Sequence, residues 1–137
     1  MGEKGSCPEG FEVSIGGYMG FSYSVSKSEK GLLRYTSFSQ GYTPYETVTV
    51  TPSDEDWEIF RKALDDLDVW NWQPEYPNPD VCDGTQWGIE IHWGEKKIAS
   101  RGDNNYPGTA GSLSETSDEF SRFLAAVRRL IGNRNFA

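Results

Sequence analysis

The chain has 137 residues, of which 36% are hydrophobic, 25% charged and 14% aromatic, and its formal net charge is −8. This length fits one domain over residues 1–137, with an ordered core over about 10–132 and frayed ends, and the apolar content excludes a disordered chain. Its apolar runs are too short to cross a membrane, and two cysteines cannot build a disulfide-rich scaffold.

Negative charge is concentrated in residues 54–90, which carry eleven acids and two bases, whereas the residues before them have a net charge of −1 and those after them +2. An acidic surface repels phosphate groups, which disfavours nucleic acids and anionic membranes as partners. It keeps a small protein soluble, and it also suits a basic protein partner.

Alternating apolar residues predict four strands in the first 51 residues. The alternation runs through 11–15, 21–25, 33–37 and 45–51. Strands at a spacing of about ten residues are typical of an antiparallel meander.

A helix is predicted over residues 52–68. Thr51 is a suitable N-cap and Pro52 a suitable first residue, and apolar side chains recur at helical spacing from Trp57 to Leu67. Acids near residue 68 oppose the negative end of the helix dipole, which predicts that the helix ends there.

The second half contains an irregular segment, a hairpin and a helix. Three prolines predict that residues 69–85 lack regular structure. Alternation from Trp87 to Trp93 predicts a strand, and residues 96–101 are expected to pair back on it. A helix is then expected to begin at the capping-box pair Thr116 and Glu119 and to end at Gly132.

The predicted order is ββββ-α-loop-ββ-α, an α+β fold. Each predicted strand has one apolar face and each helix one apolar stripe. We therefore expect an antiparallel sheet of about six strands with two helices packed on one face.

Metal, cofactor and export signals are weak. One histidine and two scattered cysteines match no metal pattern, and no cofactor-binding motif occurs, so we expect neither group. The first residues lack an apolar signal stretch, which favours the cytoplasm. If a signal peptide has been removed and the chain is exported, a Cys7–Cys82 disulfide becomes an alternative to two thiols.

His92 and Glu90 form the clearest candidate for chemistry. Residues two apart on a strand point to the same side, and a carboxylate beside an imidazole can transfer protons. With loop carboxylates they could serve a small hydrolase or a carbohydrate-binding module, although a solvated surface pair is the simpler interpretation. No nucleophile elbow, phosphate-binding loop or zinc-protease motif accompanies them, which favours a protein without catalytic residues.

The irregular segment is the main candidate for binding. It combines tryptophan and tyrosine, which are enriched at interaction hot spots, with stiffening prolines and acids. The alternatives are that both tryptophans fold inward over the core, or that the rings stack on a sugar. The candidate binding residues are Trp70, Trp72, Tyr76, Asp80 and Asp83.

The second half also resembles a family of small bacterial proteins classed as a domain of unknown function. The resemblance rests on the pattern W…C-D-G-x-x-W…G-x-N-x-Y-P…F-x-x-F-L, which begins at Trp70 and Trp72 and continues through Cys82–Trp87, Gly102–Pro107 and Phe120–Leu124. It implies a bacterial origin and a shared structural role for the Asp83, Asn104 and Tyr106 loops, and it transfers no functional residue. The favoured function is a non-catalytic domain that binds a basic protein.

Overall fold

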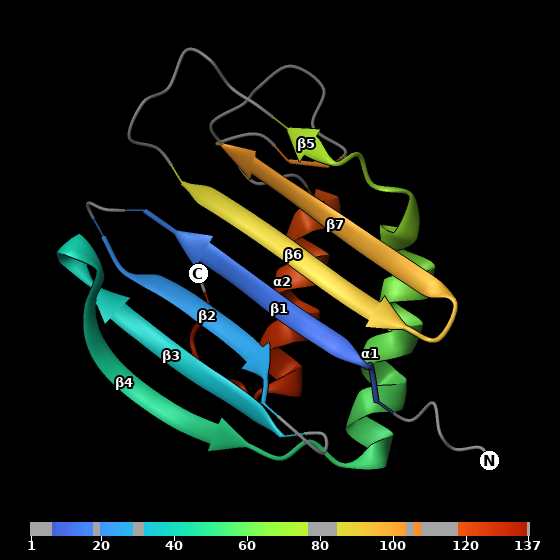
Figure 1. Ribbon diagram of the computed structural model, residues 1–137, viewed down its shortest axis with the longest axis horizontal. Helices are drawn as coiled ribbons and strands as arrows, with labels where there is room; N and C mark the ends of the chain where they lie inside the picture. The colour runs from blue at the N-terminus through green and yellow to red at the C-terminus, as the bar shows by residue number, and fades with distance from the viewer. Residues whose placement is uncertain are drawn as a thin grey trace.

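The computed structural model describes residues 7–17, 20–28, 32–76, 85–103, 106–107 and 118–136. These residues form one sheet of seven strands, in the order β4-β3-β2-β1-β6-β7-β5, and two α-helices (Figure 1). The elements are β1 (Gly10–Gly16), β2 (Ser22–Lys27), β3 (Leu33–Ser39), η1 (Gln40–Tyr42), β4 (Thr43–Val50), α1 (Asp54–Asp66), η2 (Val69–Asn71), β5 (Glu75–Tyr76), β6 (Gln86–Trp93), β7 (Lys96–Asp103) and α2 (Asp118–Leu130).

The predicted meander and hairpin are both present. Strands β1 to β4 pair in sequence, all antiparallel, and the β6–β7 hairpin joins the sheet because β6 pairs with β1. The sheet thus has one strand more than the six that were expected. The extra strand, β5, lies in the segment predicted to be irregular, and it pairs in parallel with β7.

The short strand β5 is compatible with its neighbouring prolines because it is an edge strand of only two residues. Pro74 lies just before it, and its carbonyl oxygen accepts a hydrogen bond of 3.1 Å from the backbone N–H of Arg101. Proline is tolerated at such edges, where its missing N–H need not serve a central ladder.

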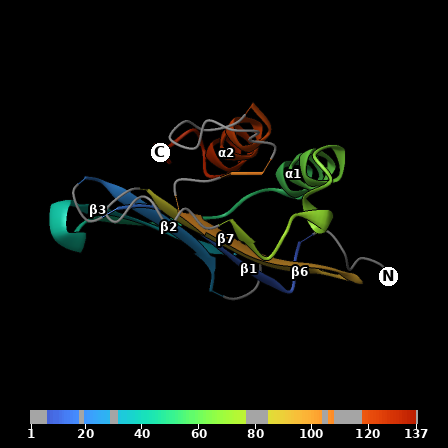
Figure 2. The same ribbon diagram turned by 90° about the horizontal axis from the view of Figure 1, so that it is seen from above.

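Both helices pack on the same face of the sheet, as expected (Figure 2). The first helix begins two residues later than predicted, and its N-cap is Ser53 instead of Thr51. The Ser53 hydroxyl accepts from the Asp56 backbone N–H at 3.0 Å, and the Asp56 carboxylate accepts from the Ser53 N–H at 3.1 Å. This capping box gives hydrogen-bond partners to two backbone N–H groups, which explains why α1 begins here. Thr116, the predicted cap of α2, lies outside the described residues.

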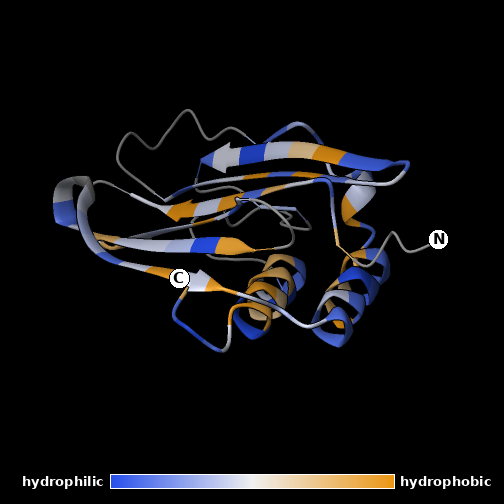
Figure 3. Cartoon of the chain, turned by 60° about the horizontal axis from the view of Figure 1, so that its bottom comes forward, coloured by the Kyte–Doolittle hydropathy of each residue, from blue (hydrophilic) through white to orange (hydrophobic). Residues whose placement is uncertain are grey.

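The core lies between the sheet and the helices. Every second residue of β1 and β6 is buried, and each helix buries one stripe. Figure 3 shows this alternation as orange and blue bands along the strands. The largest fully buried side chains are Trp57, Phe60, Phe120, Phe123 and Phe136.

The other face of the sheet carries neither of the two described helices, and small and polar side chains line it. Ser24, Ser14, Gly88 and Arg101 lie side by side across β2, β1, β6 and β7. We call this surface the open face. Neither described helix is long and apolar enough to span a membrane.

Candidate functional site

Trp72 is a core residue, which corrects the expectation that it contacts a partner. Only 8% of its surface is exposed, and its ring packs edge-on against Trp87 and Phe123. Its indole N–H donates a hydrogen bond of 2.8 Å to the Glu119 carboxylate. The polar atom of the ring is therefore satisfied inside the protein.

Trp70 is half-buried and lies against the end of α1, so the two tryptophans do not form one surface. Its indole N–H donates to the Asp65 carboxylate at 2.8 Å, and the Arg61 guanidinium lies 5.6 Å from the ring centroid. Partial burial raises the pKa of Asp65, but hydrogen bonds from Trp70 and Arg61 lower it more, so that the pKa lies below its ordinary value.

Tyr76 points to the helix-covered side of the sheet, which corrects the expectation that it contacts a partner: it pairs with Gly102, and Gly102 pairs with the buried Trp87. Its hydroxyl oxygen accepts a 2.9 Å hydrogen bond from the backbone N–H of Gln73, and its ring lies 5.8 Å from that of Trp87. These contacts pack the half-buried ring against the core at the edge of the sheet, where the residue also borders a groove. The predicted residues Asp80 and Asp83 lie outside the described residues.

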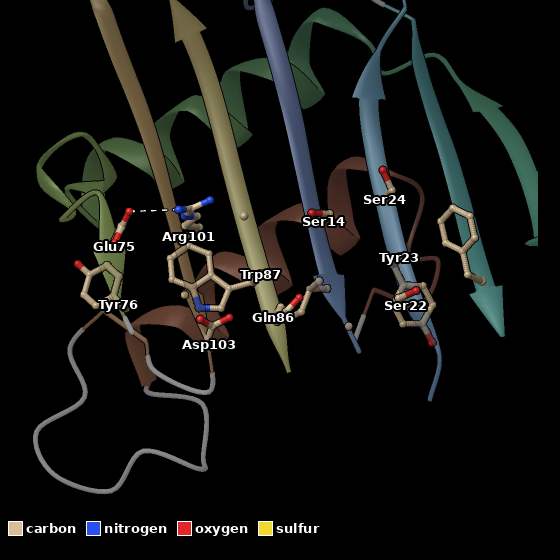
Figure 4. A pocket seen from close by; sticks show the side chains of 15 residues that line it. Ser14, Ser22, Tyr23, Ser24, Glu75, Tyr76, Gln86, Trp87, Arg101 and Asp103 are labelled. Atoms are coloured by element: carbon tan, nitrogen blue, oxygen red, sulfur yellow. Dashed lines mark hydrogen bonds and ion pairs between the residues drawn. The ribbon is translucent and has the colours of Figure 1, made fainter. Parts of the chain in front are cut away.

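The groove has a volume of about 610 Å³ and crosses the open face from β2 over β1 and β6 to β7 and β5. Figure 4 shows Ser14, Gln86 and Asp103 on neighbouring strands, with Tyr76 at one side. Gly88 leaves the floor of the groove without a side chain at this position. A Cβ added there would lie 3.8 Å from the Ser14 hydroxyl oxygen and would fill part of the groove. The volume lies within the range of small-ligand sites, and the floor is polar.

A second hollow, of about 380 Å³, continues the groove along the open face. The two share Ser14, Gly88 and Arg101, and the second adds Glu12 and Glu90. Glu12 and Glu90 lie directly opposite each other on β1 and β6. Opposed like charges destabilise a sheet unless a cation lies between them.

Carboxylates outnumber cations around this continuous groove. Of its acids, only Glu75 has an ion pair with another described residue, a 3.2 Å contact with Arg101. Glu12 and Glu90 have none within the described part of the chain. The acidic residues are Glu12, Glu75, Glu90 and Asp103, and the single base is Arg101.

Glu90 and His92 are exposed on the open face, as predicted. They line a small hollow of about 220 Å³, and Nε2 of His92 lies 3.1 Å from the Gly94 carbonyl oxygen. Among the described residues, no three side chains of metal-binding type come together. Of the two predicted candidate sites, the Glu90 and His92 pair contributes residues to the open face, whereas the described members of the other pack toward the helices.

Sequence reasoning missed most of the groove. Ser14, Gln86, Gly88, Arg101 and Asp103 occupy the non-core positions of alternating strands, and no motif singles them out. That alternation was the available signal, but it does not say which strands are neighbours. No model of a known protein family and no curated protein matches the chain.

Proposed function

We propose that the protein is a non-catalytic binding module that takes an extended, lysine- or arginine-rich segment of a protein partner along its open face. The observation that carries this proposal is the charge of the groove, where four carboxylates surround one guanidinium that is already paired with Glu75. A basic side chain placed between Glu12 and Glu90 relieves their repulsion, which gives the partner a specific anchoring point.

The shape of the groove supports an extended partner. The hollows share residues and follow one another across the open face, so the recess is long and shallow. Its floor of Ser14 and Gly88 offers a hydroxyl and backbone without bulky obstacles. A chain in an extended conformation presents alternate side chains to such a surface, which allows basic residues to reach the carboxylates.

The outer surface of α1 is also acidic, but it suits a partner less well. Asp54, Glu55 and Glu58 are exposed on a convex helix, and further along the helix Arg61 and Lys62 neutralise Asp65 and Asp66 across distances of 3.2 Å. Exposed charges on a convex surface are well screened by water and salt. We therefore assign the specific contact to the groove and the solubilising role to α1.

Calorimetric titration with an oligolysine peptide tests the proposal. Glu90→Gln combined with Asp103→Asn should weaken binding about tenfold, because both carboxylates line the groove. The matched control is Glu55→Gln combined with Glu58→Gln, which makes the same change in net charge on α1. Equal weakening by both pairs would show that only the overall charge attracts the peptide, and absence of binding to the parent protein would refute the proposal.

A carbohydrate-binding module is a second candidate, and the polar floor of the groove is the observation that favours it. The hydroxyl of Ser14 and the side chains of Gln86 and Asp103 can bind the hydroxyl groups of a sugar. In a hydrolase of the same kind, Glu90 and His92 would transfer protons. Titration with neutral oligosaccharides distinguishes the candidates: saturable binding that Gln86→Ala weakens and added salt leaves unchanged would favour the sugar.

A further inference from the structure

The two edges of the sheet differ in length. The edge strand β5 has two residues, whereas β4 at the opposite edge has eight. Among the described residues, β3 is the only strand that pairs with β4, so the outer edge of β4 has no strand partner. Unpaired N–H and C=O groups along such an edge are a template for another strand.

Protection against pairing is confined to the beginning of β4. Pro44 lacks an N–H, and the register shift at Ser37 and Phe38 leaves Tyr45 as an extra residue without a partner. Proline and bulges both discourage pairing at an edge. From Glu46 to Val50, however, the pairing with β3 is regular, which leaves an uninterrupted edge of five residues.

The composition of this five-residue edge favours pairing. Its sequence, Glu-Thr-Val-Thr-Val, contains four β-branched residues and one charge. β-branched side chains favour extended structure, and charged residues are the usual means of keeping edge strands apart.

We propose that the edge of β4 from Glu46 to Val50 pairs antiparallel with the same edge of a second copy of this chain, joining two sheets across a two-fold axis. Centred on Val48, this pairing uses all five residues. Thr47 then lies opposite Thr49 of the second copy, a favourable cross-strand pair. Glu46 lies opposite Val50 of the second copy, so no two like charges meet directly.

An exposed aromatic pair flanks the proposed seam. The side chain of Tyr45 is 69% exposed and that of Phe21 is 49% exposed, and their rings meet edge-on with centroids 5.4 Å apart. Large apolar side chains that remain exposed next to an unpaired edge mark interaction surfaces. The groove lies on other strands, so the inference is independent of the proposed function.

Sedimentation equilibrium over a series of protein concentrations tests this pairing. The parent chain should form a reversible dimer. Replacing Thr47 and Thr49 together with lysine, or both with glutamate, should raise the dimer dissociation constant at least about tenfold, because like charges then lie opposite each other. Both threonines are exposed, so each double variant should keep the monomer fold, which circular dichroism checks.

An equimolar mixture of the two double variants provides the decisive control. Lysines of one copy then face glutamates of the other, and dimers should reappear as heterodimers. A monomeric parent chain, double variants that dimerise as well as the parent, or a mixture that stays monomeric would each overturn the proposal.

Discussion

The two faces of the sheet come from the same strands and differ in almost every physical respect. On β6, Ile89 faces the helices and is buried, whereas the next residue, Glu90, is exposed opposite another carboxylate. The covered face is stabilised by apolar burial and aromatic packing, and the open face holds charges that its neighbours do not neutralise. Burial of apolar side chains on the covered face stabilises the fold. The unneutralised charges on the open face do not stabilise it, and they indicate a binding site.

The largest effect is expected on the covered face, within the segment first proposed for binding. Trp72→Ala should lower the free energy of unfolding by about 3–5 kcal/mol, because it leaves a cavity beside Trp87 and removes the hydrogen bond to Glu119. Urea denaturation measures this. Trp70→Ala is the control and should cost only about 1 kcal/mol, since that ring is half-buried. Equal losses would contradict the different burial of the two rings.

A smaller effect is expected at the beginning of α1. Ser53→Ala should cost about 1 kcal/mol of stability, because the first turn loses the hydroxyl that accepts from Asp56. Thr51→Ala, two residues earlier, should change the stability little. If urea denaturation showed a larger loss of stability for Thr51→Ala than for Ser53→Ala, Thr51 would be the N-cap instead.

The same cap should make stability depend on pH. The backbone N–H of Ser53, followed by its hydroxyl and Arg129, holds the pKa of Asp56 below its ordinary value. A carboxyl with a lowered folded-state pKa contributes stability above its unfolded pKa and loses it as the pH falls through the folded pKa. Asp56→Asn should therefore flatten the acid side of the stability profile, measured by urea denaturation at a series of acidic pH values. An unchanged slope would show that Asp56 is not the group responsible.

The smallest effect on stability is expected on the open face. Glu90→Gln should raise the free energy of unfolding by about 0.2–0.5 kcal/mol, because it removes the like charge opposite Glu12. Thermal denaturation at low salt measures the gain, and Glu58→Gln on α1 is the control for net charge. A clear loss of stability would mean that Glu90 makes a favourable contact in the folded protein.

The sequence was most informative where local periodicity decides the outcome. The alternation at Trp87–Trp93 and the helical stripe that begins at Trp57 predicted their elements, because burial on one side imposes a period. Strand β5 could not be predicted, since two residues carry no period and the strand exists only through its pairing with β7. Whether Trp72 lies inside depends on tertiary contacts with Trp87 and Phe123.

The candidate site was predictable only in part, for the same reason. Glu90 and His92 share a strand, so their common side follows from the sequence. Glu12 joins Glu90 because β1 pairs with β6, which lies more than seventy positions away in the chain. A single sequence carries no local signal for pairing between such distant strands. The groove forms only when these strands pair, so the sequence alone could not predict it.

A basic partner should bind the open face of the sheet and not α1. The most direct measurement is an NMR titration of the labelled protein with oligolysine, following the backbone amide of each residue. Binding on the open face predicts saturable shifts of the amide signals of Ser14, Gly88 and Asp103, while the signals of Glu55 and Glu58 stay unchanged. Shifts concentrated on α1, or small shifts spread over both surfaces, would contradict it.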